Sequence, residues 1–219
     1  MTRKRLQCVI FGPQGCGKGT QGQLLSDRFG IPLLGSGDMF RAEIEAKTHL
    51  GKIAEEYVAR GMLAPDEVVN AIIKKRFHEV LTEKGFLLEG YPRNVDQAES
   101  LDRLIKINLA IQIKIRDEEA VRRLLGRRQC VRCRSIFHVQ EAPSNLPGRC
   151  ALCGHALVKR EDDQEEVIRQ RLVAYHFMTE PLASYYRQRG VLLTVNGEQA
   201  ISFLFQELIK KMEKLGFAA

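Results

Sequence analysis

The sequence contains no long hydrophobic run. Its 219 residues are 44% hydrophobic, which is enough for a substantial core. Nowhere, however, do roughly 18 apolar residues follow one another, the length that a membrane-spanning helix needs. Residues 1–5 are basic, yet the apolar run after them covers only residues 6–11 and leads directly into glycines. We therefore expect a strand there instead of a signal peptide, and a cytoplasmic protein.

Internal repeats and low-complexity tracts are also absent, which excludes a repeat architecture. Without a secretory signal, the six cysteines are expected to stay in a reducing compartment, where structural disulfides are rare. Clustered thiols in such a protein favour metal binding.

Acidic residues are in the minority. There are 34 Lys and Arg against 27 Asp and Glu, a net charge of +7, which suits nucleic acid, a membrane surface or small polyanionic substrates. Several arginines stand singly beside motifs, which favours separate phosphates over a polymer backbone. They are Arg41, Arg93, Arg127, Arg160 and Arg171.

Five short apolar runs alternate with segments of helical period along most of the chain. This alternation predicts an α/β fold in which helices flank a parallel sheet. The runs cover residues 6–11, 31–34, 86–88, 109–115 and 191–195. In such folds ligands bind beyond the carboxyl ends of the strands, so we expect the site in the polar and glycine-rich stretches that follow these runs.

Two stretches interrupt the alternation. Residues 35–64 have helix-like patterning without a strand and are expected to form a small helical lobe. Residues 126–163 lose the helical period, contain four cysteines and are expected to form a compact insert. The predicted core is the rest of the chain, residues 1–34, 65–125 and 164–219. Within it, residues 164–186 are expected to be helical with an interruption near Pro181, and residues 198–215 to form a closing helix.

The strongest local signal is a glycine-rich loop between the first apolar run and a helical pattern. It reads Gly-Pro-Gln-Gly-Cys-Gly-Lys-Gly-Thr over residues 12–20. Glycines let backbone N–H groups surround an anion at a helix N-terminus, and Lys18 adds a charge for the outer phosphates. Gly19 stands where the general motif has Ser or Thr, so magnesium is expected to be held chiefly by phosphates and water. Thr20 would reach a phosphate from another side.

The second strong signal is a pair of Cys-x-x-Cys knuckles. Cys130 and Cys133 are separated by sixteen residues from Cys150 and Cys153, a spacing typical of a structural zinc site with four thiolates. Four thiolates fill the coordination sphere, so zinc is expected to stabilise the insert and not to act in catalysis. A redox pair and buried thiols are the alternatives.

From the glycine-rich loop onward the sequence resembles the adenylate kinase family. The Gly-Lys-Gly-Thr variant of the loop is typical of that family, and further motifs follow in the family's order over nearly the whole chain. They are Ser-Gly-Asp-Met-Phe-Arg at residues 36–41, Glu-Gly-Tyr-Pro-Arg at 89–93, Gly-Arg-Arg at 126–128 and Arg-Glu-Asp-Asp-Gln-Glu-Glu at 160–166. The resemblance implies a P-loop NTPase fold with a five-stranded parallel sheet, a helical AMP-binding lobe and a zinc-stapled lid. It also implies Mg²⁺-dependent, reversible phosphoryl transfer from ATP to AMP, which yields two ADP.

The resemblance further implies an AMP site. Arg41 and Arg93 would grip the single phosphate, and the Gln97 amide would offer a donor and an acceptor to adenine. The other members of this site would be Ser36, Met62, Leu63, Ala64, Gly90, Tyr91, Pro92, Arg160 and Arg171.

The implied ATP site begins in the glycine-rich loop. Ile136 and Phe137 would clamp the adenine, and Gln199 would make a backbone contact. The remaining members would be Gly15, Cys16, Gly17, Lys18, Gly19, Thr20 and Arg127. Charge on the transferring phosphoryl group would be stabilised by Lys18, Arg93, Arg127, Arg160 and Arg171. No general base is needed, because the acceptor phosphate of AMP is already ionised.

Glu89 departs from the family, which usually has Asp at this position to help hold the water shell of magnesium; we assign Glu89 the same role. Within the kinase class, GTP:AMP phosphotransferase and UMP/CMP kinase are the alternatives, and Gln97 together with the zinc lid favours AMP as acceptor. The alternative outside the kinases is a zinc-ribbon nucleic-acid-binding protein, which would be consistent with the two Cys-x-x-Cys knuckles and the basic net charge. We expect a monomer without nucleic-acid or membrane partners.

Overall fold

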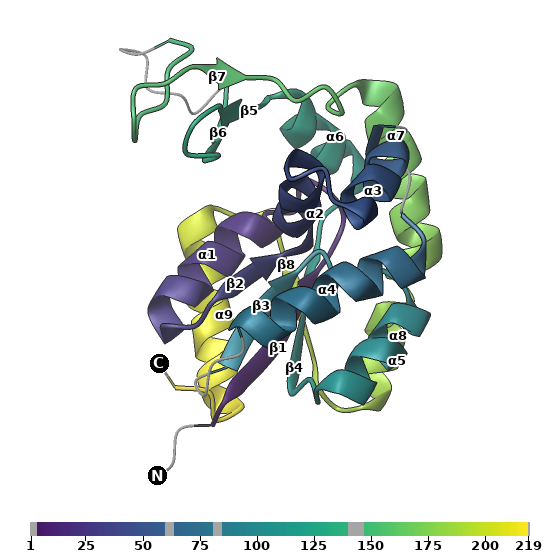
Figure 1. The fold of residues 1–219 in the computed structure, drawn as a ribbon. Helices are drawn as coiled ribbons and strands as arrows, with labels where there is room; N and C mark the ends of the chain where they lie inside the picture. Colours follow the sequence, from purple (N-terminus) through teal and green to yellow (C-terminus); the bar gives the residue numbers. More distant parts are fainter. Residues whose placement is uncertain (1–3, 60–63, 81–84, 140–146, 219) are drawn as a thin grey trace.

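The structure, a computed structural model, describes residues 4–59, 64–80, 85–139 and 147–218. A five-stranded parallel sheet of order β2-β3-β1-β4-β8 forms its centre (Figure 1). Its strands are β1 (Leu6–Phe11), β2 (Leu33–Gly35), β3 (Gly85–Glu89), β4 (Leu109–Lys114) and β8 (Leu192–Asn196). Each of the five apolar runs contributes one strand, so the predicted fold class is confirmed.

Side chains of the central strand β1 alternate between two hydrophobic cores. Val9 and Phe11 pack into the core on one face of the sheet, whereas Cys8 and Ile10 pack into the core on the other face. Because both faces are buried, the strand is apolar at successive positions, which is typical of parallel sheets covered by helices.

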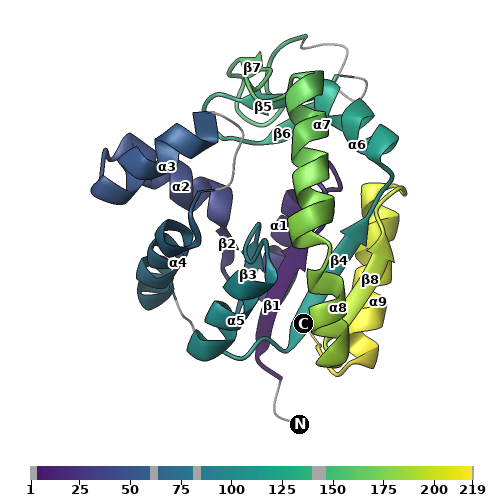
Figure 2. The ribbon, with the colours of Figure 1, turned by 90° about the vertical axis from the view of Figure 1, so that its right-hand side faces the viewer.

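Helices cover both faces of the sheet. The first face packs against α4 (Asp66–Val80), α5 (Val95–Leu104) and α8 (Leu182–Gln188), and the second against α1 (Lys18–Phe29) and α9 (Ile201–Lys214). Figure 2 shows α4 and α9 on opposite sides of the sheet. None of the helices in the described part of the chain is long and apolar enough to cross a membrane.

Between β2 and β3 the chain forms two further helices, α2 (Ser36–Glu45) and α3 (His49–Ala59), as the helical patterning predicted. The second insert forms a small antiparallel sheet, which the sequence interpretation did not include. Its strands are β6 (Ile136–His138), β5 (Arg127–Cys130) and β7 (Leu157–Val158), in that order. This sheet projects clear of the parallel sheet, on the side where β1 meets α1 (Figure 1).

Two helices connect the small sheet to the rest of the molecule. They are α6 (Asp117–Leu125) before it and α7 (Glu165–Ala174) after it, and they share a third apolar cluster. The chain after α7 differs from the prediction in detail. A π-helical turn at Tyr175–Thr179 interrupts the helix before Pro181, and Pro181 itself is the N-cap of α8. A proline is well tolerated at a helix start because its missing N–H is not needed there.

Candidate active site

The glycine-rich loop joins the carboxyl end of β1 to the first residue of α1. Gly12, Gly15 and Gly17 have φ angles of 155°, 82° and 93°, a region that glycine adopts easily. A Cβ atom at Gly12 would lie 2.3 Å from the carbonyl O of Ile113. A Cβ atom at Gly17 or Gly19 would meet nothing within 4 Å. The loop is therefore packed tightly against β4, while the N-terminus of α1 opens to space that suits a phosphate.

Lys18 lies at the mouth of this loop. Its ammonium group donates to the carbonyl O atoms of Gly12 and Pro13, both at 2.8 Å. Cys16 is fully buried below, with its Sγ 3.7 Å from Nζ of Lys18. Burial raises the pKa of the Cys16 thiol, so its side chain is a neutral filler. Thr20 is exposed on the first turn of α1.

Arg123, which the motifs did not single out, lies against the same loop. Its guanidinium donates to the carbonyl O of Gly15 at 3.4 Å and of Gly197 at 2.9 Å, and it pairs with Glu119 at 2.6 Å. The available signal was its place four residues after Glu119 within α6, which puts these two side chains on adjacent turns of the helix.

A second group of predicted residues meets at the carboxyl end of β3. The carbonyl O of Gly90 accepts hydrogen bonds from Oγ of Ser36 at 2.8 Å and from Nε of Arg93 at 2.7 Å. Gly90 has a φ of 76°, and a Cβ atom there would lie 2.6 Å from Oγ of Ser36. The start of α2 and the loop after β3 are thus brought together around one glycine.

Gln97 is buried beside this group. Its Oε1 accepts from the backbone N–H of Arg93 at 2.7 Å, and its Nε2 donates to Asp66 at 2.6 Å. Tyr91, which precedes a cis peptide bond to Pro92, donates from its hydroxyl to Oδ1 of Asn70 at 2.5 Å. Burial raises the pKa of Tyr91, so the phenol stays neutral, and its hydroxyl has a hydrogen-bond partner in Asn70.

The other residues assigned to the AMP site fall in three places. Arg41 pairs with Asp38 on the same helix, α2. Ala64 is buried in the core of the first face. Met62 and Leu63 lie outside the described residues.

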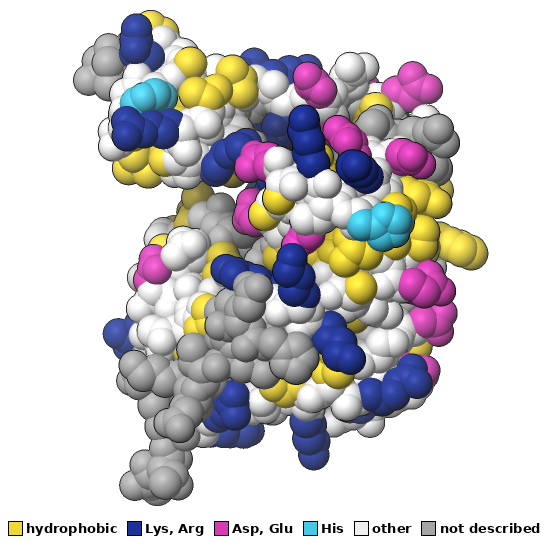
Figure 3. Space-filling model, in the orientation of Figure 1, with side chains coloured by type: hydrophobic (Ala, Val, Ile, Leu, Met, Phe, Trp, Pro, Cys, Tyr) yellow, Lys and Arg dark blue, Asp and Glu magenta, His cyan; other side chains and the backbone are white. Residues whose placement is uncertain are grey.

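Three further arginines of the predicted site have polar partners on the small sheet or in the chain between it and α7. Arg127 makes a bidentate pair with the buried carboxylate of Asp163, at 2.9 and 2.6 Å. Nε of Arg160 donates to Gln129 at 2.9 Å. Arg171 pairs with Asp162 at 2.6 Å. Figure 3 shows a notch between the lid and the body below it, with Lys and Arg side chains along the upper side of the notch.

These arginines lie close enough to repel one another. Burial lowers the pKa of Arg160, and the nearby charges of Arg127 and Arg41 lower it further. Burial likewise lowers the pKa of Arg93, where Glu89 opposes the effect and Arg171 adds to it. Cations that converge without an equal number of carboxylates create a positive potential, which a polyanionic ligand would neutralise.

The remaining residues assigned to the ATP site lie in two places, on β6 and just after β8. Ile136 is 48% exposed on β6, and the neighbouring Phe137 is half-buried. The side-chain amide of Gln199 donates to the carbonyl O of Asn196 at 2.8 Å and to Glu207 at 2.6 Å. Because that amide is already occupied, a nucleotide contact at Gln199 would use its backbone.

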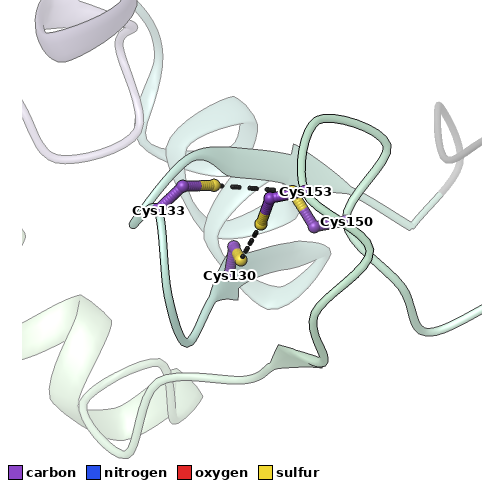
Figure 4. Close-up of side chains that lie close together, drawn as sticks. All are labelled: Cys130, Cys133, Cys150 and Cys153. Atoms are coloured by element: carbon purple, nitrogen blue, oxygen red, sulfur yellow. Dashed lines mark hydrogen bonds between the residues drawn. The ribbon is translucent and has the colours of Figure 1, made fainter.

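The four cysteines of the knuckles converge at one end of the small sheet (Figure 4). Their Sγ atoms all lie within 4.8 Å of one another. The Sγ atoms of Cys130 and Cys153 are 3.4 Å apart, and those of Cys133 and Cys150 are 3.5 Å apart. A tetrahedral zinc with ordinary Zn–S bonds requires Sγ–Sγ separations of about 3.8 Å. Ser135 lowers the pKa of Cys133 to about 6, which favours the thiolate form that metals bind. The donor set and its geometry fit zinc.

Comparison with known proteins identifies the family. The sequence profile of the family described as Adenylate kinase matches residues 10–191. The chain belongs to the adenylate kinase family.

Three curated adenylate kinases match it over nearly their full lengths. That of Caldicellulosiruptor saccharolyticus is 41% identical over 212 residues, which cover 94% of this chain and 99% of the relative. That of Archaeoglobus fulgidus is 40% identical over 215 residues, with coverage of 96% and 99%. That of Thermodesulfovibrio yellowstonii is 41% identical over 214 residues, with coverage of 95% and 100%.

The family resemblance inferred from the motifs is therefore confirmed. Membership of the adenylate kinase family makes the chain a phosphotransferase of the nucleoside monophosphate kinase type.

Proposed function

We propose that this member of the adenylate kinase family moves the terminal phosphoryl group of ATP to AMP, and reverses the reaction with two ADP. One observation carries the proposal. The glycine-rich loop and the Ser36–Gly90–Arg93 group lie at the carboxyl ends of two adjacent strands, since Ile10 of β1 is paired with Glu89 of β3. Two phosphorylated ligands bound at these places would face each other across a short gap.

In this proposal the loop binds the donor phosphates. The backbone of residues 15–20 surrounds them, and Lys18 leaves its carbonyl partners to contact the outer phosphates. Arg41 and Arg93 grip the AMP phosphate, each with a planar guanidinium that suits two phosphate oxygens. Arg127, Arg160 and Arg171 stabilise the charge on the group in transfer, which is the main catalytic need of this reaction.

The metals have separate roles. Mg²⁺ carried by ATP would neutralise phosphate charge, and Glu89 would orient its water shell. Glu89 suits this task because its charge reaches both Cys16 of the loop and Arg93: it adds to the effect of burial, which raises the pKa of the Cys16 thiol, and opposes the effect of burial, which lowers the pKa of Arg93. Zinc on Cys130, Cys133, Cys150 and Cys153 would only stabilise the lid.

The proposed organisation is a core with two closing parts, the lobe at residues 35–64 and the lid at residues 126–163. Closure excludes water, which would otherwise hydrolyse ATP. Ile136 and Phe137 would cover the ATP adenine, and Gln97 would contact the AMP base. We further propose that the protein is a cytoplasmic monomer.

The test is a matrix of initial rates with ATP, GTP and CTP as donors and AMP, UMP and CMP as acceptors. We expect AMP to be the preferred acceptor and ATP the preferred donor. Preference for UMP or CMP, or for GTP, would favour one of the related kinases instead. Retention on single-stranded DNA that falls steeply with salt, with no phosphoryl transfer in any combination, would overturn the proposal in favour of nucleic-acid binding.

A further inference from the structure

We propose that Asp66 is a positioning residue that fixes the direction in which Gln97 presents its side-chain amide. Through Gln97 it would set the preference of the acceptor site for adenine over 6-oxopurines. This inference rests on the proposed function, because it concerns the base of the acceptor nucleotide.

The Gln97 amide is held from both ends. Gln97 is only 1% exposed, in the first turn of α5. Its Oε1 accepts from the backbone N–H of Arg93 at 2.7 Å, and its Nε2 donates to Oδ1 of Asp66 at 2.6 Å. An amide can be turned by 180° with little change in shape, so its neighbours decide which end carries the oxygen.

Each of the two groups that contact this amide can form hydrogen bonds in one direction only. A carboxylate accepts and cannot donate, whereas a backbone N–H donates and cannot accept. A reversed Gln97 amide would place N–H against N–H at Arg93 and oxygen against oxygen at Asp66. It would lose both hydrogen bonds and leave polar groups unmatched in a buried position, which is strongly unfavourable.

Asp66 is itself held in place by Asn94. Nδ2 of Asn94 donates to Oδ2 of Asp66 at 3.0 Å and to Oδ1 at 3.2 Å. Oδ1 of Asn94 accepts from the backbone N–H of Gln97 at 2.7 Å and so caps α5. The carboxylate at the start of α4 is thus tied to the start of α5 by two side chains, those of Asn94 and Gln97, and its oxygen is fixed where Nε2 of Gln97 needs it.

The observed direction of the amide leaves a defined pattern for a ligand. Among the described residues, the Gln97 amide forms one hydrogen bond at each end, so one lone pair on Oε1 and one N–H on Nε2 remain. Adenine offers an amino donor at C6 and an acceptor at N1, which match this pattern. A 6-oxopurine offers an acceptor at C6 and a donor at N1, which match only the reversed amide. Asp66 therefore favours AMP over a 6-oxopurine nucleotide.

The test compares AMP and IMP as acceptors, with saturating ATP as donor. For Asp66→Ala we expect the KM for AMP to rise about tenfold, with a smaller change in kcat. The preference for AMP over IMP, measured as the ratio of kcat/KM values, should fall by a similar factor. Asp66→Asn keeps the size of the side chain and one acceptor oxygen. Its KM for AMP should lie between that of the unmutated protein and that of Asp66→Ala.

Two controls separate positioning from a general structural role. Glu67→Ala removes the next acidic residue in the first turn of α4, which is exposed, and should leave KM and the base preference unchanged. In a Gln97→Ala background, Asp66→Ala should have no further effect on either quantity, because its action passes through Gln97.

The inference would be overturned if folded Asp66→Ala and Asp66→Asn kept the normal KM for AMP and the normal preference over IMP. A full effect of Asp66→Ala in the absence of Gln97 would overturn it as well. If the unmutated protein phosphorylates AMP and these variants behave as it does, only this inference fails. If the unmutated protein does not phosphorylate AMP, the proposed function fails with it.

Discussion

At the scale of single residues, the glycine-rich loop depends on backbone geometry that glycine alone provides. Gly12 combines a positive φ of 155° with a Cβ position only 2.3 Å from the carbonyl O of Ile113. Gly19 lies in the first turn of α1, where an added Cβ would meet nothing within 4 Å. The two glycines of this motif therefore have different roles. Gly12 is required because a side chain would clash with β4, whereas Gly19 leaves open space at the N-terminus of α1.

We predict that Gly12→Ala lowers the free energy of unfolding by at least about 1–3 kcal/mol, the range for a strained backbone conformation. The clash with β4 adds to this effect. Gly19→Ala, the matched control, should leave the free energy of unfolding unchanged or raise it by up to about 1 kcal/mol, because alanine favours the helix. Urea denaturation of the two variants measures the difference. Equal stabilities would contradict the tight packing of Gly12 against β4.

The sequence identified residues of the candidate site where they lie in contiguous motifs at strand ends. Ser36, Gly90 and Arg93 are examples, and the structure joins them through one carbonyl oxygen. Residues that reach the site from elsewhere carried no such signal. Arg123 contacts the loop only because α6 packs beside it, and Asp66 meets Gln97 only because α4 and α5 are neighbours. Such contacts depend on tertiary packing, which local patterns do not encode.

At the scale of secondary structure, elements with a strong hydrophobic period were predictable and short ones were not. The five strands of the parallel sheet are apolar because both of their faces are buried. The strands of the small sheet are two to four residues long, and residues such as Arg127 and Gln129 give them no apolar alternation. The cysteine cluster lies at one end of this small sheet, and the spacing of the cysteines revealed it although the hydrophobic period did not.

The π-helical turn after α7 contains a histidine that links two helices. Nδ1 of His176 lies 2.8 Å from a carboxylate oxygen of Glu180, and Nε2 lies 2.9 Å from a carboxylate oxygen of Asp117 in the first turn of α6. Glu180 and Asp117 raise the pKa of His176 above its ordinary value of 6.5. The pair with Asp117 joins α6 to the π-helical turn, whereas the pair with Glu180 lies within one stretch of the chain.

From this geometry we predict a pH-dependent contribution to stability. The pKa of His176 is higher in the folded state than in the unfolded state, so its stabilising effect is fully present below pH 6.5 and is lost as the pH rises through the raised value. The effect should be at most about 1 kcal/mol, because the side chains are partly exposed and screened by solvent. Urea denaturation of the unmutated protein and of His176→Gln, from about pH 6 to about pH 9, measures it.

In that experiment the unmutated protein should be the more stable one at the acidic end, and the two should converge at the alkaline end. A stability difference that stays constant with pH would show that His176 contributes packing and no charge. A difference that grows with pH would contradict the direction of the pKa shift.

At the scale of the whole molecule, the lid and the helical lobe touch through a weak contact. Arg134 of the lid lies 3.1 Å from Glu45 at the end of α2, and both side chains are more than half exposed. Exposed pairs of this kind contribute about 0–1 kcal/mol. The mutual repulsion of Arg160, Arg127 and Arg41 opposes approach of the same parts. We therefore expect closure to require bound phosphates, which would turn this repulsion into attraction.

The proposed zinc site belongs to this scale because it would stabilise one part of the molecule without touching the reaction. The lid contains little apolar core, since Ile136, Val139 and Val158 are each nearly half exposed. In the proposed function, the lid nevertheless has to hold Arg127 and Arg160 in defined positions. A metal bound by four thiolates supplies folding free energy where hydrophobic burial is small.

We predict that the purified protein carries about one zinc per chain, the number expected for a single four-thiolate site. Replacing Cys150 and Cys153 with serine should abolish zinc binding and lower the melting temperature by several degrees, roughly 2–4 °C for each kcal/mol lost in a chain of this size. Appreciable phosphoryl transfer should remain at low temperature, where the bound nucleotide can still order the lid.

Arg132→Ser is the matched control, because this exposed residue lies between Cys130 and Cys133 and is not a ligand. The Arg132→Ser protein should keep both its zinc and its stability. Metal analysis, thermal melting and initial rates provide the readouts. A folded cysteine variant with no turnover at low temperature would show that the metal acts in catalysis, and unchanged melting would show that the knuckles are not a structural site.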